Sequence, residues 1–250
     1  MSFRAAWITG ASTGIGRALA LELASKGTRV AVSARSADGL AALAGHADNI
    51  MSVPLDVTDR NAVAQAADII EAAFGDLDLC VPNAGISQAW SATAPDADAF
   101  ERLFDVNVTG VVNTLAAVVP RFVDRGRGQI SVMSSVAGFR GLPTAAAYCS
   151  SKAAVTVLCE SMKLDLDQAG VKMQVIHPGF VETPLTDKNP FRMPFLMSPE
   201  EAAKRICQGL ARDRFEITFP RRFTWWLKLM RCLPYGMYFP VVRRFTGLRG

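Results

Sequence analysis

A tyrosine and a lysine four residues apart are the first side chains in this sequence that could do proton chemistry. Tyr148 and Lys152 would share one face of a helix, because residues at this spacing are neighbours on a helix surface. A free phenol titrates near pH 10, and a nearby ammonium favours the phenolate and lowers that pKa. The pair could therefore exchange a proton with an alcohol or carbonyl oxygen. On its own, the pair is better explained as a surface contact.

A glycine-rich segment follows the first predicted strand. The strand Ala5–Thr9 leads into Gly10-Ala11-Ser12-Thr13-Gly14-Ile15-Gly16, and a helix is predicted over Ile15–Lys26. Glycines allow the backbone to turn tightly and approach phosphates, and the unpaired N–H groups of a helix N-terminus attract anions. Three glycines alone are a weak signal, but their position after a strand favours a pyrophosphate site over an ordinary turn.

The second predicted strand, Arg29–Ser33, ends close to Arg35. A dinucleotide-binding fold that prefers NAD places an acid near this point to bind the ribose hydroxyls. No acid stands at this strand end, and a guanidinium can bind a 2′-phosphate through two hydrogen bonds. We therefore predict that NADP(H) is preferred and that NAD(H) can also bind. The alternative is that Arg35 is a solvated loop charge.

Polar residues also follow the third and fourth predicted strands. Asp56 and Val57 come after Ile50–Leu55, and Asn83-Ala84-Gly85 follows Leu77–Pro82. Ligands bind at the carboxyl ends of strands in open α/β sheets, so these residues should belong to one site. Asp56 could accept a hydrogen bond from an adenine amino group. A helix cap or turn explains this aspartate about as well.

Seven motifs occur in a fixed order along residues 5 to about 190. They are TGASTGIG at 9–16, LDV at 55–57, NAG at 83–85, DVNVTG with Asn107, VMSSVAG with Ser135, AYCSSK with Tyr148 and Lys152, and PGFVET at 178–183. Taken together, these motifs and their spacing resemble the classical short-chain dehydrogenases/reductases. The resemblance implies hydride transfer between a nicotinamide and an alcohol or carbonyl.

The resemblance also implies a role for each matched residue. Tyr148 is the expected acid in reduction and base in oxidation, and Ser135 rather than Ser134 hydrogen-bonds the substrate oxygen. Lys152 also contacts the nicotinamide ribose, and Asn107 holds a water in a proton relay to Lys152. The expected cofactor contacts are Gly10, Ser12, Thr13, Gly14, Ile15, Gly16, Arg35, Asp56, Val57, Asn83, Ala84, Gly85, Tyr148, Lys152, Pro178, Gly179, Val181 and Thr183, the last at the nicotinamide carboxamide.

Alternating strands and helices position these residues. Short runs rich in Val and Ile are typical of strands buried on both faces, and helical patterns lie between them. We therefore predict an α/β protein with one Rossmann-fold domain over 1–220, a doubly wound parallel sheet of about seven strands, and a C-terminal helical extension over 221–250 of the same domain. The remaining predicted strands are Gln129–Ser134, Lys172–His177 and Phe215–Phe219, and two further helices are predicted over Thr58–Phe74, capped by Thr58 or Asp59, and Ser198–Leu210.

Composition excludes several classes of protein. Half of the 250 residues are hydrophobic and 20% are charged, which is too apolar for a disordered chain and too polar for several membrane spans. Five cysteines without a CxxC pair indicate reduced thiols, and with no secretory signal visible this predicts a cytoplasmic protein. His177 has no acidic partner at a telling spacing, so we interpret it as a loop or core residue. His46 is expected at the surface, and no metal site is predicted.

The C-terminal segment differs from the rest of the chain. Residues 215–250 contain seven Lys/Arg, one acid and nine of the 21 aromatic residues, whereas residues 1–214 contain 20 basic and 22 acidic residues. We predict two short helices over 221–245, separated near Pro234-Tyr235-Gly236, because proline and glycine end the first. Every stretch of the ~20 apolar residues needed to span a bilayer is interrupted, by Lys228, Arg231 or Pro234.

Three partners fit this segment. Packing on another subunit is slightly favoured over peripheral contact with a membrane, in which aromatic rings insert and cations meet anionic headgroups. Packing on its own body is the third alternative. No recognition motif supports nucleic-acid binding. The family resemblance implies a homodimer or homotetramer.

Residues 184–198 are expected to form a lid over the substrate. Its apolar residues suit a bulky apolar substrate, or they only pack the lid on the body; they are Phe191, Met193, Phe195, Leu196 and Met197. The leading hypothesis is an NADP(H)-dependent oxidoreductase that interconverts a carbonyl and a secondary alcohol on a lipophilic substrate. One alternative is a 3-oxoacyl-[acyl-carrier-protein] reductase. An alternative of another class is a non-catalytic nucleotide-sensing or scaffold protein, against which the complete set of Ser135, Tyr148, Lys152 and Asn107 argues.

Overall fold

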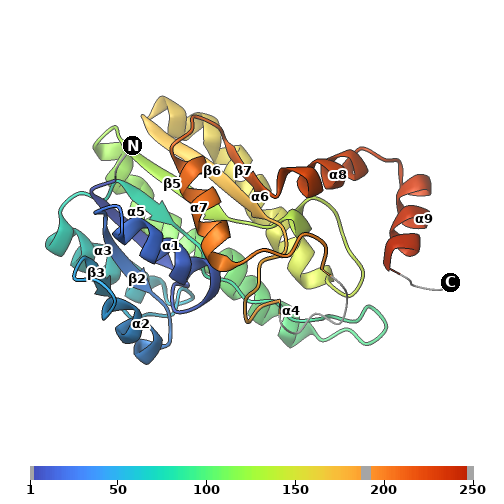
Figure 1. The fold of residues 1–250 in the computed structure, drawn as a ribbon, viewed down its shortest axis with the longest axis horizontal. Helices are drawn as coiled ribbons and strands as arrows, with labels where there is room; N and C mark the ends of the chain where they lie inside the picture. Colours follow the sequence, from blue (N-terminus) through green and yellow to red (C-terminus); the bar gives the residue numbers. More distant parts are fainter. Residues whose placement is uncertain (1–2, 187–192, 247–250) are drawn as a thin grey trace.

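Seven short apolar segments become the strands of a single parallel sheet. The structure, a computed structural model, describes residues 3–186 and 193–246. Most strand residues are buried, as expected for a sheet with helices on both faces (Figure 1). The strand order is β3-β2-β1-β4-β5-β6-β7. The strands are β1 (Ala5–Thr9), β2 (Arg29–Ser33), β3 (Ile50–Ser52), β4 (Leu79–Val81), β5 (Gly128–Met133), β6 (Val171–Pro178) and β7 (Glu216–Phe219).

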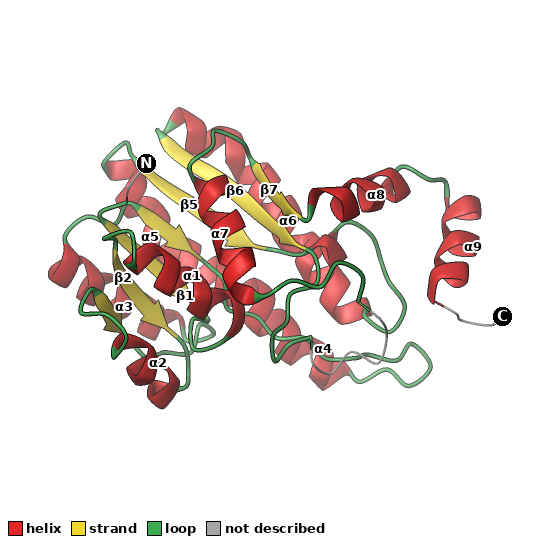
Figure 2. Cartoon of the chain, in the orientation of Figure 1, coloured by secondary structure: helices red, strands yellow, loops and turns green. Residues whose placement is uncertain are grey.

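Helices cover both faces of this sheet (Figure 2). Residues of α1, α2 and α7 form one core layer, which includes Leu19 and Ile206. Residues of α3, α5 and α6 form the other, which includes Ile70 and Phe122. The helices are α1 (Gly14–Ala24), α2 (Ala37–Ala44), α3 (Arg60–Phe74), α4 (Ala97–Phe104), α5 (Gly110–Asp124), α6 (Ala146–Gln168), α7 (Pro199–Leu210), α8 (Arg221–Arg231) and α9 (Tyr235–Thr246), with a π-helical turn η1 (Asp105–Thr109) and a 3-10 turn η2 (Val136–Gly138).

The predicted doubly wound parallel sheet is confirmed, with differences at strand and helix ends. β3 ends at Ser52 rather than Leu55. The backbone N–H of Val53 still donates to a carbonyl within β2, and that of Leu55 donates to a carbonyl just after β2. Asp59, rather than Thr58, caps α3 by accepting two backbone N–H groups. The predicted capping box at Ser198 is present, because its hydroxyl accepts the Glu201 N–H at 3.1 Å.

The chain order reverses between β1 and β4, which are neighbours in the sheet. β2 and β3 follow β1 in the chain and lie on one side of the β1–β4 pair. β5, β6 and β7 follow β4 and lie on the other side. The crossover connections therefore diverge at this point and leave a crevice at the carboxyl ends of the two strands. The glycine-rich loop and Asn83-Ala84-Gly85 follow these two strands, so the fold brings the predicted cofactor residues to this crevice.

The helical stretch Ala97–Asp124 joins α4, η1 and α5. By length and composition alone it could cross a membrane, but half of its most apolar window is buried inside the protein. Here η1 contacts α6 and α5 contacts α3, as in a core helix. The π-helical turn holds Asn107, and such turns often occur at functional sites.

The last two helices project from the edge of the body where β7 ends (Figure 1). They match the two helices predicted over 221–245, with one difference. Tyr235 and Gly236 belong to the second helix, so the break spans only 232–234. The backbone carbonyl of Pro234 accepts the N–H groups of both Met237 and Tyr238. Backbone N–H groups at the start of a helix have no partner within the helix. A proline, which has no N–H group, therefore loses no hydrogen bond at this position.

Candidate active site

The glycine-rich loop packs tightly against the loop that follows β4. Gly10 has a φ of +66°, and a Cβ there would lie 2.6 Å from the Ala84 Cα. A Cβ on Gly16 would lie 2.5 Å from the Asn83 Nδ2 atom. Both distances are too short for any side chain, so the two loops approach only because glycines stand here.

Asn83 holds these two loops together. Its Nδ2 donates to the Thr9 and Gly10 carbonyls at 2.9 and 3.0 Å, and its backbone N–H donates to the Thr9 hydroxyl at 3.0 Å. The amide hydrogens of Asn83 are therefore occupied within the protein. Asn83 shapes the cofactor crevice and offers a ligand only its remaining oxygen.

The crevice has the features of a dinucleotide site. The side chain of Thr13 does not cap α1, and no acid lies in the first turn of this helix. The helix N-terminus therefore leaves its backbone donors and positive dipole end available to an anion. Gly14 has a φ of +57°, and a Cβ there would lie 3.0 Å from Thr183 Cγ2, so the loop reaches the PGFVET segment. Ser12 and Ile15 are partly exposed on the same loop.

Arg35 is exposed just beyond the end of β2. Among residues 3–186 and 193–246 its side chain has no hydrogen-bond or ion-pair partner. Its serine neighbours are committed elsewhere, because Ser33 accepts from the Trp7 indole at 3.0 Å and Ser36 caps α2. Arg35 is thus a free cation near the mouth of the crevice.

The residues after β3 divide into a turn and a packing contact. One oxygen of Asp56 accepts from both the backbone N–H and the hydroxyl of Thr58 at 2.9 Å. Val57 is buried, and a Cβ on Gly110 would lie 2.5 Å from its Cγ2 atom. Asp56 therefore forms the turn that the sequence allowed as an alternative, with its second oxygen left for a ligand.

Ser135, Tyr148 and Lys152 converge where β5 ends and α6 begins. Lys152 is only 3% exposed, and its Nζ donates to the Met133 carbonyl at 3.0 Å. This Nζ lies 5.8 Å from the centre of the Tyr148 ring. The Ser135 side chain is partly exposed and hydrogen-bonds Tyr148, whereas Ser134 is buried and donates to the Lys152 carbonyl. The structure thus places Ser135, not Ser134, beside the phenol.

The electrostatics of the pair differ from the sequence expectation. Desolvation raises the pKa of Tyr148 to about 12, although the hydrogen bond with Ser135 acts in the opposite direction. Desolvation lowers the pKa of Lys152 to about 8. The expected lowering of the Tyr148 pKa by Lys152 is therefore wrong for the protein without ligands. Lys152 is buried and Tyr148 is partly buried, and the ammonium is bonded to a carbonyl rather than to the phenol.

Asn107 is fully buried in η1 and makes three side-chain hydrogen bonds. Its Oδ1 accepts the Ile86 N–H at 2.8 Å, and its Nδ2 donates to the Ile86 carbonyl at 2.9 Å and the Ser151 hydroxyl at 3.1 Å. A Cβ on Gly85 would lie 3.2 Å from Asn107 Oδ1 and 3.5 Å from Lys152 Nζ. Asn107 therefore fixes the backbone beside Lys152, and Gly85 leaves the space next to the ammonium open.

A buried polar chain supports Lys152 from behind. Ser134 and Thr156 both donate to the Lys152 carbonyl at 2.9 Å, and Thr156 lies 3.1 Å from the Nε2 atom of His177. The Nδ1 atom of His177 lies 3.0 Å from a Glu216 carboxylate oxygen, although its geometry is not that of an aligned hydrogen bond. His177 is therefore a buried core residue of β6, as the sequence allowed, but it has an acidic partner that the sequence did not reveal. His46 is exposed, as expected.

Glu216 connects this chain to the C-terminal helices. Burial raises the pKa of Glu216, but the close contacts with His177 and Lys228 outweigh burial and hold that pKa below its usual value. Lys228 lies on α8 and forms an ion pair with Glu216. The polar chain thus runs from the helix that carries Tyr148 to the first helix of the C-terminal segment.

Arg140 forms a second connection to the same helices. It lies between Ser135 and Tyr148 in the sequence and donates to the carbonyls that end α8, those of Met230, Arg231 and Leu233. Its guanidinium also stacks on the Tyr238 ring at 3.9 Å, and the Tyr238 hydroxyl donates to the Gly141 carbonyl at 2.6 Å. No pattern in the sequence pointed to Arg140, because its partners are backbone atoms ninety residues away.

The lid lies partly within the described residues. Met197 is buried and its backbone bridges to Val181, so it packs the lid on the body. Phe195 and Leu196 are exposed, and the Phe195 ring lies 5.9 Å from Phe223 on α8. Phe191, which we expected in the same lining, lies outside the described residues. Gly179 donates its N–H to Phe219 at 2.7 Å, next to Pro178 at the end of β6.

The crevice and the Tyr148 cluster are the arrangement expected of an oxidoreductase that uses a nicotinamide cofactor and acts on CH–OH groups. The open helix N-terminus and the uncovered space at Gly85 fit the pyrophosphate and the nicotinamide half of such a cofactor. A family model described as short chain dehydrogenase matches residues 4–192. The chain therefore belongs to the short-chain dehydrogenase/reductase family.

Relatives and solved structures agree with this assignment. An oxidoreductase of Myxococcus xanthus (strain DK1622) is 40% identical over 248 residues, which is 98% of both chains. An oxidoreductase of Staphylococcus haemolyticus is 34% identical over 210 residues, which is 83% of this chain and 90% of the relative.

Two similar solved structures contain a bound cofactor. A short chain dehydrogenase/reductase from Burkholderia phymatum in complex with NAD has a TM-score of 0.82 and 26% identity, over 91% of this chain and 92% of that one. A 3-ketoacyl-(acyl-carrier-protein) reductase from Brucella melitensis complexed with NADH has a TM-score of 0.80 and 25% identity, over 87% and 98%.

Proposed function

We propose that this oxidoreductase uses NADP(H) to interconvert a ketone and a secondary alcohol on a lipophilic substrate. The proposal rests above all on the convergence of Tyr148, Ser135 and the buried Lys152 at one end of the dinucleotide crevice. When bound, the cofactor supplies a hydride to the carbonyl carbon or accepts one from the alcohol.

Tyr148 is the proton donor in the proposed reduction. Its raised pKa keeps the phenol protonated near neutral pH, so it can donate to the carbonyl oxygen as negative charge develops there. Ser135 orients the same oxygen by a hydrogen bond. Lys152 stabilises the resulting phenolate and can bind the ribose, while Asn107 and Gly85 keep its surroundings open.

Arg35 supports the preference for NADP(H). We expect Arg35→Asp to weaken NADPH binding by about 10–100-fold and to leave NADH binding nearly unchanged, since each hydrogen bond to a charged group contributes about 1.5–3 kcal/mol. Titration of both cofactors against both proteins measures this. Arg212→Asp, at the opposite edge of the sheet, is the matched control. Equal affinity of the wild type for NADPH and NADH would contradict the assignment.

A panel of carbonyl compounds tests the function itself. With NADPH, we expect ketones to be reduced with a kcat/KM that rises with the apolar chain length, because Phe195 and Leu196 are exposed on the lid. Oxidation of NADPH is followed by absorbance. If the protein binds NADPH but turns over no member of a broad panel, it is a nucleotide-sensing protein instead.

One observation favours a second substrate class. Arg221 and Arg222 flank a groove beside the lid, and a basic surface would attract an acidic acyl carrier protein. A 3-oxoacyl group on such a carrier is the substrate in that case. A kcat/KM that is much higher for the carrier-bound thioester than for the same acyl group on a short thiol would favour this alternative.

We further propose that the protein is cytoplasmic and assembles as a homodimer or homotetramer. The assembly follows from the family, whose members commonly pack the helix that carries the tyrosine and lysine against a partner subunit. In this chain α6 has exposed apolar residues available for such a contact, Val157 and Leu164. Closed symmetric assemblies are the common form of soluble oligomers.

A further inference from the structure

The C-terminal helices pack on the body with one side only. On α8, Thr224 is buried and Lys228 pairs with Glu216. On α9, Tyr238 and Val242 are buried, and Arg140 contacts both helices. The other side of each helix carries large apolar side chains that remain exposed. We call this surface the tail face and define it by Trp225, Trp226, Leu229, Met237 and Phe239.

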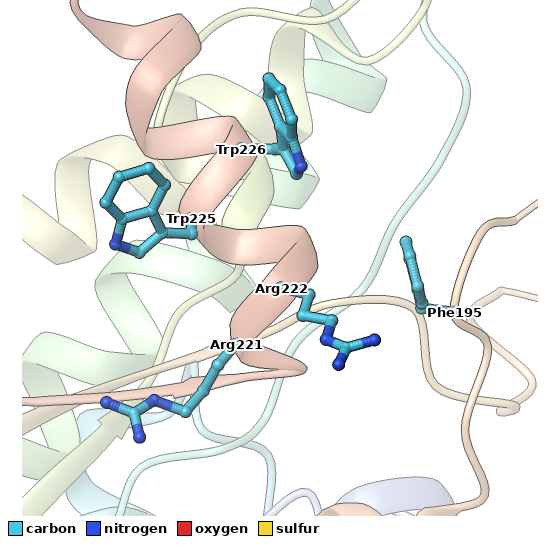
Figure 3. A pocket seen from close by; sticks show the side chains of 5 residues that line it. All are labelled: Phe195, Arg221, Arg222, Trp225 and Trp226. Carbon is cyan, nitrogen blue, oxygen red and sulfur yellow. The ribbon is translucent and has the colours of Figure 1, made fainter.

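The exposure of the two tryptophans is unusually high for such large side chains. Trp225 is 72% exposed and Trp226 is 67% exposed. Each follows an arginine by four residues, so Arg221 lies along the helix from Trp225 and Arg222 from Trp226 (Figure 3). Together with Phe195 of the lid, these four side chains line a groove of about 480 Å³. The groove is therefore apolar with a cationic rim.

The arginines around the tail face have no acidic partner within the part of the chain that the structure describes. The sequence contains no Asp or Glu after Glu216. In the described ranges, no ion pair involves Arg221, Arg222, Arg231, Arg243 or Arg244. A bound partner must therefore supply both negative charge and an apolar environment for the rings.

We propose that the tail face binds the surface of an anionic lipid bilayer. Tryptophan and tyrosine favour the boundary between hydrocarbon and headgroups, and arginines beside them bind anionic headgroups. A second copy of the chain fits less well. In a two-fold dimer the same patch occurs on both sides, so these arginines would face one another without acids between them.

The position of the tail face determines which part of the protein would face the bilayer. α8 begins directly after β7, at the carboxyl edge of the sheet where Tyr148 and the crevice lie. Phe195 of the lid lines the same groove. A bilayer at the tail face would therefore lie next to the substrate entrance, and a lipophilic ketone could enter from the membrane. This last point rests on the proposed function, whereas the binding itself does not.

Flotation with vesicles tests the binding without any turnover. We expect the whole protein to float with equimolar phosphatidylglycerol and phosphatidylcholine vesicles and not with phosphatidylcholine alone. Binding should weaken as ionic strength rises from about 0.01 M to about 1 M, where the Debye length falls from about 30 Å to about 3 Å. Tryptophan emission should shift to shorter wavelength on binding, because the exposed indoles enter a drier environment.

Two double variants separate the contribution of charge from that of ring insertion, and a third serves as the control. Arg221→Glu with Arg222→Glu should lower partitioning at least 25-fold, since each cation near an anionic surface contributes a factor of about five. Trp225→Ser with Trp226→Ser should abolish the emission shift. Arg212→Glu with Arg214→Glu makes the same charge change at the amino edge of the sheet and should leave binding within about twofold. Circular dichroism confirms that each variant is folded.

Two results would overturn the proposal. The first is the absence of binding to anionic vesicles by the wild type at low ionic strength. The second is binding that is equal in the wild type and the tryptophan variant. If, in addition, light scattering shows that the tryptophan variant has a smaller assembly than the wild type, the tail face is a subunit interface. Neither result bears on ketone reduction, which is measured separately.

Discussion

Tyr148→Phe is expected to reduce kcat by about 10²–10⁴-fold, the usual contribution of a positioned general acid. The substitution removes one hydroxyl and leaves the ring packed as before. It removes the only group in the proposed site that donates a proton directly to the substrate oxygen. The Kd for NADPH should change less than about threefold, because the pyrophosphate contacts lie at the other end of the crevice. Steady-state kinetics and cofactor titration measure the two quantities.

Tyr235→Phe is the matched control for this substitution. Tyr235 is exposed on α9, and in the described structure its hydroxyl makes no hydrogen bond. The same loss of a phenol hydroxyl there should leave kcat unchanged. A Tyr148→Phe enzyme with near-normal kcat would show that another group donates the proton.

Lys152→Met is expected to do two opposite things: abolish most activity and stabilise the fold near neutral pH. The pKa of Lys152 falls from 10.5 to about 8 through desolvation, which corresponds to a cost of about 3 kcal/mol for holding the ammonium in the folded protein. Methionine has a similar length and no charge. It leaves the Met133 carbonyl without its partner, which costs about 1–2 kcal/mol. The net gain in free energy of unfolding is about 1–2 kcal/mol.

The difference in free energy of unfolding between the wild type and the variant changes sign with pH. Between pH 8 and 10.5 the unfolded chain holds a proton on Lys152 that the folded chain has released. The free energy of unfolding of the wild type therefore rises with pH across this window relative to the variant. The variant should be more stable below about pH 8 and less stable above about pH 10.5. Denaturant unfolding at several pH values measures the crossing.

Lys163→Met on the same helix serves as the control. Lys163 is partly exposed and pairs with Asp167, so the same substitution there removes a surface ion pair and not a buried ammonium. No crossing with pH is expected for this variant. A Lys152→Met protein that is less stable than the wild type at every pH would contradict a desolvated ammonium at this position.

Sequence reasoning predicted the features that depend on neighbours along the chain. The β1 strand, its glycine turn and α1 were predicted within two residues at each end, because glycine and apolar periodicity act locally. The gathering of the motif segments at the carboxyl edge followed from the parallel sheet alone. Ser135 was chosen over Ser134 from the family resemblance, and it is the serine that lies beside Tyr148, while its role in catalysis stays a prediction.

Features that depend on distant pairing were not visible in the sequence. His177 meets Glu216 only because β6 and β7 are neighbours in the sheet, which no spacing between the two residues reveals. The raised pKa of Tyr148 depends on burial from several elements, so the simple argument from a nearby lysine gave the wrong direction. Asn83 was expected at the cofactor, whereas its amide hydrogens are used to join two loops.

The contacts of Arg140 have a consequence for how this protein can diverge. Its guanidinium recognises main-chain carbonyls at the end of α8, which every amino-acid sequence provides. The attachment of the C-terminal helices is therefore largely indifferent to the side chains on their outer surface. Mutations that replace those side chains would leave the attachment intact. Descendants of one ancestral enzyme could therefore bind different partners through these helices while they keep the same catalytic core.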